Sequence, residues 1–348
     1  MLDVAIVGAG LSGLICAQQL RRSGYQVALI EKSRGLGGRL ATRRLPNTCA
    51  DHGVRFLDEQ GTRTGELIQA GRDRNLLQAW TDSEHQLNGE LGSTAVPPRY
   101  AAADGMTAIA KALATQLEIH HSLRVVQLAA GESWRLTCES GEAFEARSIG
   151  LAIPAPQAAT LIESIAFPPT DLLTQVRSVE FDPCLTVIAT YDRKYQAEVE
   201  SLPWRSIEVN HDDVTWIGID SSKRKNSAAP VMVLHSSAEF ALRFLEAEDL
   251  QAIANHLLDC ASNLLPWLNQ PEILQIHRWR YAFVRRACPD LTLLATHPLP
   301  IACCGDWCGG TNVEAALRSG EATAAQINQL LDDRTVPPLD FAAILDES

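Results

Sequence analysis

The sequence predicts an α/β fold of two domains, in which a parallel sheet is split along the chain and an antiparallel sheet is inserted. The chain has 348 residues, more than one ordinary hydrophobic core requires. Its first thirty residues alternate between buried-strand and amphipathic-helix patterns, as parallel sheets do. Between about residues 157 and 275, separated strands replace this alternation. These three observations support one nucleotide-binding type of sheet and one α+β insertion.

The composition indicates a globular protein and excludes large polyanionic partners. The chain carries 30 lysines and arginines against 42 aspartates and glutamates, a formal net charge of −12. This acidic balance argues against binding to nucleic acid or to an anionic membrane surface. A small anionic ligand is still compatible with it, because helix dipoles and a few arginines act locally.

The cysteines and the first residues predict a cytoplasmic protein. The nine cysteines are odd in number and contain no C-x-x-C pair, so they do not form a disulfide framework. Cys303, Cys304 and Cys308 are spaced poorly for a tetrahedral metal, and we expect no metal site. The chain opens without a basic signal-peptide region, and no apolar stretch approaches the ~18 residues of a membrane span.

A dinucleotide-binding motif follows the first strand. Residues 4–7 form a continuous apolar run, a helical pattern follows up to Gly24, and residues 26–30 form a second strand that ends at Glu31. Between the first strand and the helix lies a G-x-G-x-x-G sequence of Gly8, Ala9, Gly10, Leu11, Ser12 and Gly13. The strand, glycine turn, helix, strand and acid together predict a Rossmann-type unit.

Each residue of this motif has a mechanical reason. Gly8 permits a tight turn, Gly10 lets a pyrophosphate approach the backbone, and Gly13 lets the helix pack closely on the strand. The carboxylate of Glu31 accepts hydrogen bonds from an adenosine ribose and repels a 2′-phosphate, which favours FAD or NAD over NADP. The alternative is a glycine-rich turn with a purely structural role.

A second glycine turn favours FAD. Lys32 follows Glu31, and Gly38 precedes Arg39 at the end of a run rich in glycine. An extended dinucleotide needs such a second loop to hold its far half, and Arg39 can neutralise its phosphates.

The remaining elements fit a nucleotide fold interrupted by an insertion. We expect a helix from residues 104–106 to about Leu117, and a Pro-Ala-Pro break at 154–156. A helix over about 250–258 is expected to end the insertion. Residues 221–226 are interpreted as a solvated loop, with a basic substrate-binding patch as the alternative. The expected strands in this part of the chain are 124–128, 133–138, 148–153, 184–191, 214–219 and 231–235.

The C-terminal part carries a second cofactor signal. An apolar strand at 301–304 is followed by Gly305-Asp306, and a helix runs from about Thr311 to Leu331. A helix N-terminus stabilises negative charge on a ligand that lies against it. As an alternative, Gly305-Asp306 is a simple turn with a helix cap.

The domain boundaries follow from these patterns. We expect the nucleotide-binding domain to comprise residues 1–56, 101–156 and 276–335. The inserted substrate domain is expected to comprise residues 57–100 and 157–275, and a C-terminal tail residues 336–348.

Four segments resemble the renalase family of the flavin-containing amine oxidase superfamily. They are residues 38–44, 51–56, 152–158 and 277–282. The resemblance implies a Rossmann-type FAD-binding domain with an inserted substrate domain, arranged as in p-hydroxybenzoate hydroxylase, and non-covalent FAD. A thioether between Cys308 and the flavin is an alternative. The cofactor contacts implied beyond the glycine motifs are Arg55, Phe56, Val126, Asp306, Asn312 and Val313.

Three substrate-side residues are candidates for catalysis. His235 ends a strand and matches a renalase histidine; it lies near the flavin or is a buried core histidine. Trp279 is a wall of the substrate cavity or a packing residue. Arg55 stands where renalases have glutamine, and a fixed positive charge there would favour an anionic substrate or a reduced flavin.

The predicted activity is redox chemistry carried by FAD. Motifs of serine hydrolases, zinc proteases and P-loop enzymes are absent from the sequence. The resemblance implies an oxidase of dihydronicotinamide nucleotides, isomers of NAD(P)H, with dioxygen as acceptor. The alternatives are an FAD-dependent amine oxidase or desaturase acting on another small molecule, and a flavin-binding protein without catalytic activity.

Overall fold

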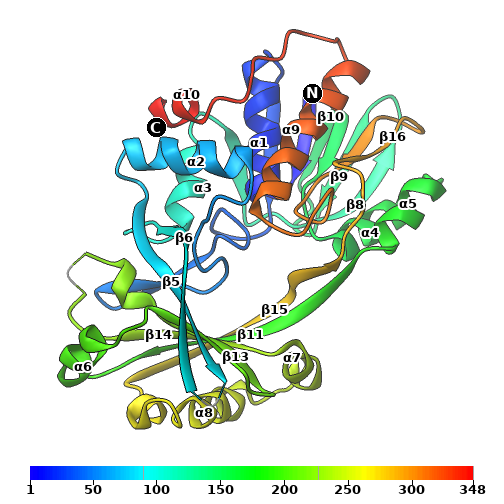
Figure 1. Cartoon of the computed structure of the whole chain (residues 1–348). Coiled ribbons are helices and arrows are strands. Elements are labelled where there is room, and N and C mark those ends of the chain that lie inside the picture. Colours follow the sequence, from blue (N-terminus) through cyan, green and yellow to red (C-terminus); the bar gives the residue numbers. More distant parts are fainter. Residues whose placement is uncertain (89, 226, 348) are drawn as a thin grey trace.

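Two large sheets organise the protein, as the computed structural model in Figure 1 shows for residues 1–88, 90–225 and 227–347. The first is mostly parallel, and the second is mostly antiparallel. Strands β3 (Thr42–Leu45) and β4 (Thr48–Asp51) form a separate hairpin. This confirms the predicted α/β fold with an antiparallel insertion.

The first sheet has the order β16–β17–β10–β1–β2–β7, with β9 beside β10 and β8 beside β9. Strands β1 and β2 are apolar over residues 4–7 and 27–30, as expected for central strands whose sheet is covered on both faces. The strands expected at 124–128, 133–138 and 148–153 correspond to β8, β9 and β10, which pair in an antiparallel meander. The bounds in this sheet are β1 Leu2–Val7, β2 Val27–Glu31, β7 Glu118–His121, β8 Val125–Ala130, β9 Trp134–Cys138, β10 Ala143–Leu151, β16 Leu293–Ala295 and β17 Ile301–Cys303.

Two groups of helices cover the first sheet. On one side α1 and α9 pack together, because Gly320 of α9 lies so close to α1 that a Cβ there would be 2.4 Å from the carbonyl oxygen of Ser12. On the other side α4 and α5 pack with β8 and β9. Helix α3 is shorter than predicted and ends at Leu113 rather than Leu117. The helices are α1 Leu11–Arg22, α3 Thr107–Leu113, α4 Ala155–Glu163, α5 Thr170–Arg177 and α9 Val313–Leu330.

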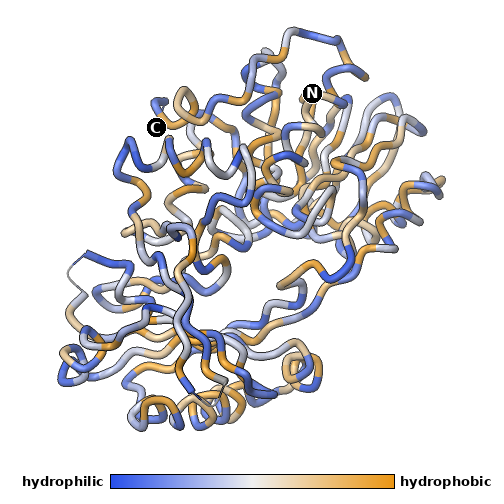
Figure 2. Tube along the Cα trace, viewed as in Figure 1, coloured by the Kyte–Doolittle hydropathy of each residue, from blue (hydrophilic) through white to orange (hydrophobic). Residues whose placement is uncertain are grey.

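The second sheet has the order β15–β11–β14–β13–β12–β5–β6. Helix α8 covers its outer face, and Figure 2 shows hydrophobic and hydrophilic residues alternating along this helix. The inner face, which carries Trp216 and Val233, is turned toward the β3–β4 hairpin. The bounds are β5 Gln78–Asn88, β6 Glu90–Ala101, β11 Glu180–Thr190, β12 Ser206–Val209, β13 Val214–Ile219, β14 Val231–Ser236, β15 Ile273–Arg286, α6 Gln196–Ser201, α7 Ala238–Phe244 and α8 Leu250–Ala261.

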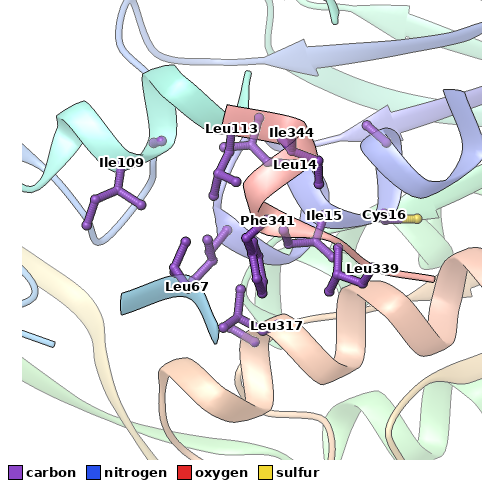
Figure 3. Close-up of a cluster of buried hydrophobic side chains, with 14 of the residues drawn as sticks. Leu14, Ile15, Cys16, Leu67, Ile109, Leu113, Leu317, Leu339, Phe341 and Ile344 are labelled. Carbon is purple, nitrogen blue, oxygen red and sulfur yellow. The ribbon is translucent and has the colours of Figure 1, made fainter. Parts of the chain in front are cut away.

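Three segments lie elsewhere than the predicted boundaries indicated. Residues 276–286 belong to β15 of the second sheet, because β15 continues its pairing with β11. Helix α2 (Thr62–Asp73), predicted within the insertion, packs instead with α9 and α10 in the core of the first domain. The predicted tail contains α10 (Phe341–Asp346), and Figure 3 shows Phe341 packed among Leu67, Ile15 and Leu317.

The prediction of a solvated loop at 221–226 is wrong for the residues of this range that the structure describes. Residues 220–223 form a short 3₁₀ helix, and the side chains of Lys223 and Arg224 are 1% and 5% exposed. Both cations pair with the carboxylates of Asp51 and Asp220, at 2.7–3.4 Å. Asp51 ends β4 and also accepts from the backbone N–H of Met106, so these ion pairs join the second sheet to the first domain. Asn226 lies outside the described residues.

Among the described residues, no helix combines the length and the apolar character that crossing a bilayer demands.

Candidate active site

A cavity of about 1890 Å³ extends from the β1–α1 turn to the inner face of the second sheet. Its volume exceeds the ~300–1,000 Å³ of a pocket for one drug-sized ligand, so a dinucleotide and a substrate fit together. The sequence-predicted residues that line it are Gly8, Gly10, Leu11, Ser12, Glu31, Lys32, Gly38, Arg39, Arg55, Phe56, Val126, His235, Trp279, Asp306, Asn312 and Val313. Ala9 and Gly13 lie behind the turn and act through the backbone.

The glycine turn leaves space for a dinucleotide. A Cβ on Gly10 would meet no atom within 4 Å, and it would enter the cavity that Gly10 lines. A Cβ on Gly13, by contrast, would be 2.2 Å from the carbonyl oxygen of Gly8, so Gly13 is needed for packing. No side chain of the described residues caps the start of α1. Its N–H groups are therefore available to a phosphate, and the turn fits FAD.

The carboxylate of Glu31 is fixed at the end of β2. Its Oε2 accepts from the backbone N–H of Ala9 at 2.9 Å, and its Oε1 accepts from that of Ser33 at 2.8 Å. Glu31 is only 8% exposed, and each oxygen retains a lone pair for a ribose hydroxyl. Lys32 extends beside it and donates to the Oε1 of Gln157 at 3.4 Å.

Arg39 and Asp306 reach the cavity as a pair. The guanidinium of Arg39 donates to both carboxylate oxygens of Asp306, at 2.6 and 2.7 Å. Gly37 and Gly38 adopt positive φ angles of 95° and 55°, which turn the chain so that Arg39 faces the loop after β17. The positive charge of Arg39, which was predicted to neutralise cofactor phosphates, is thus partly offset by the negative charge of Asp306, the other predicted cofactor residue.

The start of α9 forms the far wall of the cavity. Asn312 is its N-cap, and its side-chain oxygen accepts from the backbone N–H of Ala315 at 3.0 Å. Val313 is the first helical residue. Cys308 is fully buried and is not part of the cavity wall, and burial raises the pKa of its thiol.

The substrate side of the cavity is a row of residues across the second sheet. Strand register places His235 of β14 opposite Thr186 of β11, and Thr186 opposite His277 of β15. Directly opposed residues point to the same face of a sheet, here the face that lines the cavity. Trp279 lies two residues further along β15 on that same face.

His52 and His277 are neutral at physiological pH. Their rings meet edge to face at 4.8 Å, and the indole Nε1–H of Trp279 donates to the carbonyl oxygen of His52 at 2.7 Å. Burial lowers the pKa of His52 to about 3 and that of His277 to about 4, with the charge of Arg43 acting in the same direction. These imidazoles and the indole form an uncharged aromatic surface.

Arg55 is not a free charge. Its Nη1 donates to Oε1 of Glu208 at 2.9 Å, its Nε donates to Nδ1 of His235 at 3.2 Å, and its guanidinium lies 4.6 Å from the centre of the Trp216 ring. Burial lowers the pKa of His235 well below its ordinary value, so this histidine is neutral. Because Nδ1 accepts from Arg55, Nε2 of His235 carries the proton, and it is buried without a partner among the described residues.

Arg43 supplies the free cation that the sequence predicted at Arg55. Arg43 lines the cavity, and its guanidinium has no hydrogen-bond or ion-pair partner within the described ranges. Sequence reasoning missed Arg43, His52 and His277 as substrate-side residues. All three stand inside the motifs that carry the family resemblance, which was the available signal.

Comparisons with known proteins identify the family of the chain. The model of the family "Flavin containing amine oxidoreductase" matches residues 65–328, and the model "NAD(P)-binding Rossmann-like domain" matches residues 6–69. Renalase from Mus musculus is 24% identical over 335 residues, which cover 88% of this chain and 92% of renalase. Achacin from Lissachatina fulica is 54% identical over 72 residues, which are 20% of this chain and 14% of achacin.

Solved structures share the fold over nearly the whole chain. Cyclohexylamine oxidase from Brevibacterium oxydans IH-35A superposes with a TM-score of 0.72 at 14% identity and covers 95% of this chain and 99% of that one. A protein described as a protoporphyrinogen oxidase from Exiguobacterium sp. 255-15 gives 0.73 at 14%, covering 96% and 99%. The family model spans most of the chain and the glycine turn fits the cofactor, so this chain belongs to the flavin containing amine oxidoreductase family and is a renalase-like, FAD-dependent oxidoreductase.

Proposed function

We propose that the protein is a renalase-like oxidase that converts dihydronicotinamide nucleotides, isomers of NAD(P)H, to NAD(P)⁺ with dioxygen as the acceptor. The observation that carries the proposal is the guanidinium of Arg43, which has no partner among the described residues and lies beside the neutral rings of His52 and His277. A nucleotide substrate brings phosphates that pair with Arg43 and a flat ring that lies against Trp279. The match to renalase, which spans most of both chains, supports the same substrate class.

The roles of the chain's own residues follow from their charges. FAD, held at the glycine turn, at Glu31 and at the start of α9, would supply the two-electron redox chemistry, for which dioxygen would be the acceptor and, with a proton, would give hydrogen peroxide. Arg43 binds and orients the anionic part of the substrate. The uncharged faces of His277 and Trp279 exclude water from the ring, and the Nε2–H of His235 is a donor without a partner among the described residues.

The alternative substrate class is an amine. An amine is cationic at neutral pH, and Arg43 and Arg44, which both line the cavity, repel it. The family description and the fold shared with an amine oxidase are compatible with an amine substrate, so amines are included in the flavin reduction experiment.

Anaerobic reduction of the flavin separates these functions. FAD-loaded protein is mixed with the 2-, 4- and 6-dihydro isomers of NAD(P)H and with a panel of amines, and flavin absorbance is followed. We expect rapid bleaching by the 2- and 6-dihydro isomers and little by ordinary NAD(P)H. Bleaching by amines alone would establish the alternative, and no bleaching by any compound would indicate a non-catalytic flavoprotein.

A charge variant tests the role of Arg43. We expect Arg43→Gln to raise the half-saturating concentration of the reactive isomer about tenfold, equivalent to about 1.4 kcal/mol. The matched control is Arg177→Gln, which removes an exposed guanidinium on α5, away from the cavity. An unchanged half-saturating concentration in Arg43→Gln would remove the anion-binding role.

A further inference from the structure

Four metal-binding side chains meet on the outer side of the second sheet. His211 and Asp213 lie in the turn between β12 and β13, and His256 and Cys260 lie on α8. The spacing of His256 and Cys260 is i, i+4, which places both on one face of the helix. No residue of this group is among those that line the cavity within the described residues.

The donor atoms are close enough to share one ion. Nε2 of His256 is 2.8 Å from Oδ2 of Asp213 and 3.6 Å from Sγ of Cys260. The ligand atoms of His211, Asp213 and Cys260 lie within 4.8 Å of one another. Metal–ligand bonds of 2.0–2.3 Å in a tetrahedron separate the donor atoms by about 3.3–3.8 Å. These separations, 2.8 Å, 3.6 Å and up to 4.8 Å, span that range, so small movements of the side chains bring the donor atoms to it.

Neighbouring residues hold the group in place. The N-cap of α7, Ser237, donates its backbone N–H to the carbonyl oxygen of Asp213 at 2.9 Å, which fixes the turn against α7. The ring of Phe240 stacks on that of His256, with centroids 5.4 Å apart and planes 5° from parallel. Arg243 donates to Oδ1 of Asp213 at 2.7 Å and so orients the carboxylate while Oδ2 faces His256.

The group is accessible from solvent. The side chain of His256 is 51% exposed and that of Asp213 is 17% exposed, while His211 lies at the surface. Cys260 is half-buried, whereas most cysteines of the described residues are fully buried. An ion therefore reaches these ligands without a rearrangement of the fold.

We propose that His211, Asp213, His256 and Cys260 form a zinc site that fastens α8 to the β12–β13 turn. A thiolate and two imidazoles favour a borderline metal such as Zn²⁺ over the oxygen-binding Mg²⁺ and Ca²⁺. All four positions are filled by protein ligands, as in structural zinc sites, and the ion has no contact with the cavity. The site is independent of the proposed substrate.

Cobalt(II) is the spectroscopic probe for this site. FAD-loaded protein is freed of metal with a chelator and titrated with CoCl₂, and absorbance is recorded at wavelengths longer than those the flavin absorbs. We expect the visible bands of tetrahedral cobalt to saturate at one equivalent and to disappear when ZnCl₂ is added. We also expect ZnCl₂ to raise the Tm of the metal-free protein. Absence of the cobalt bands and of the Tm shift would overturn the proposal.

Conservative variants assign the ligands. We expect Cys260→Ser to weaken zinc binding at least about tenfold, because loss of even an outer-shell partner costs about 10–100-fold. Cys49→Ser is the matched control, since Cys49 is also half-buried but lies on β4. The Tm without zinc and the FAD content of each variant report whether it folds. Equal zinc affinity in wild type and Cys260→Ser would overturn the assignment.

Discussion

The guanidinium of Arg39 holds both carboxylate oxygens of Asp306, at 2.6 and 2.7 Å, and thereby joins the loop after β2 to the loop after β17. Both loops line the cavity from opposite ends of the sequence. The two side chains are 27% and 13% exposed, so solvent screens the pair only in part. Their pairing fixes the distance between the two loops, which have to hold one cofactor together.

Breaking this pair is expected to weaken FAD retention. Asp306→Asn keeps the shape of the side chain but removes its charge, so Arg39 loses its bidentate partner and the loops separate more easily. We expect the Kd for FAD to rise about tenfold, equivalent to about 1.4 kcal/mol. Equilibrium titration of the flavin-free protein, followed by flavin fluorescence, measures it. The control is Glu163→Gln, whose carboxylate pairs with Arg177 at the surface; an equal effect there would contradict the prediction.

The glycine turn permits a prediction that separates binding from folding. Gly10→Ala adds a methyl group where no atom lies within 4 Å and where φ is −77°, so we expect stability to change by less than about 1 kcal/mol. The same methyl group enters the dinucleotide space, and FAD affinity should fall at least about tenfold.

Gly13→Ala is expected to do the reverse. Its Cβ would overlap the carbonyl oxygen of Gly8 at 2.2 Å, and such overpacking costs about 1–3 kcal/mol of stability. Urea unfolding of both flavin-free variants, alongside FAD titration, distinguishes the two effects. Unchanged FAD affinity in Gly10→Ala would show that the open space beside Gly10 has no role in binding, and an equal loss of stability in the two variants would contradict the assignment of a packing role to Gly13 alone.

The sequence predicted those features whose physical cause is local. The G-x-G-x-x-G turn, the buried strands β1 and β2 and the helix that begins near residues 311–313 depend on neighbouring residues, so their sequence patterns could be recognised. The end of α3 and the placement of α2 could not be predicted, because packing against distant segments such as α10 decides them. Lys223 and Arg224 looked solvated because their partner Asp51 lies far away in the sequence.

The candidate site follows the same rule. The motifs named residues that gather around one cavity, whereas the pairing and charge of each side chain could not be predicted from the sequence. Arg55 is neutralised by Glu208 of β12, a contact that only the folded sheet creates, and Arg43 is left free among the described residues. The neutrality of His52 and His277 likewise results from burial in the fold, which lowers the pKa of both imidazoles.

Burial of the uncharged histidines makes stability depend on pH. The folded pKa values, about 3 for His52 and about 4 for His277, lie below the ordinary value of about 6.5, so between these values the unfolded chain binds protons that the folded protein does not. This stability is fully present above pH 6.5 and is lost as pH falls toward 4. We expect each histidine to steepen the loss by at most about 1.4 kcal/mol per pH unit.

The free energy of urea unfolding at pH 7 and pH 5 measures this effect. His277→Gln should lose less stability than wild type between the two values, because one of the titrating groups is gone. His297→Gln, at an exposed position, is the control and should follow wild type. Parallel profiles for His277→Gln and wild type would contradict the prediction. Arg43 faces both rings and Asp51 faces His52; burial raises the pKa of the Asp51 carboxyl, but the charges of Lys223 and Arg224 outweigh it and hold that pKa below its ordinary value.

The buried ion pairs of the 3₁₀ helix give the sharpest test of how the domains are joined. Lys223→Met leaves Asp51 and Asp220 with Arg224 as their remaining cation in a region that water does not reach, and removing one partner of a buried pair costs about 3–5 kcal/mol. Lys225→Met, two residues away at an exposed position, should change the unfolding free energy by less than about 0.5 kcal/mol.

A second substitution tests whether charge is the cause. In Lys223→Met/Asp220→Asn one acid remains for one cation, so the charges balance again and part of the stability should return. Urea unfolding of the single and double variants forms a double-mutant cycle. If Asp220→Asn adds its own loss to that of Lys223→Met, the two side chains act independently, and the contact of the Lys223 ammonium with the Trp80 ring, 5.0 Å from its centroid, would explain the effect instead of the ion pair with Asp220.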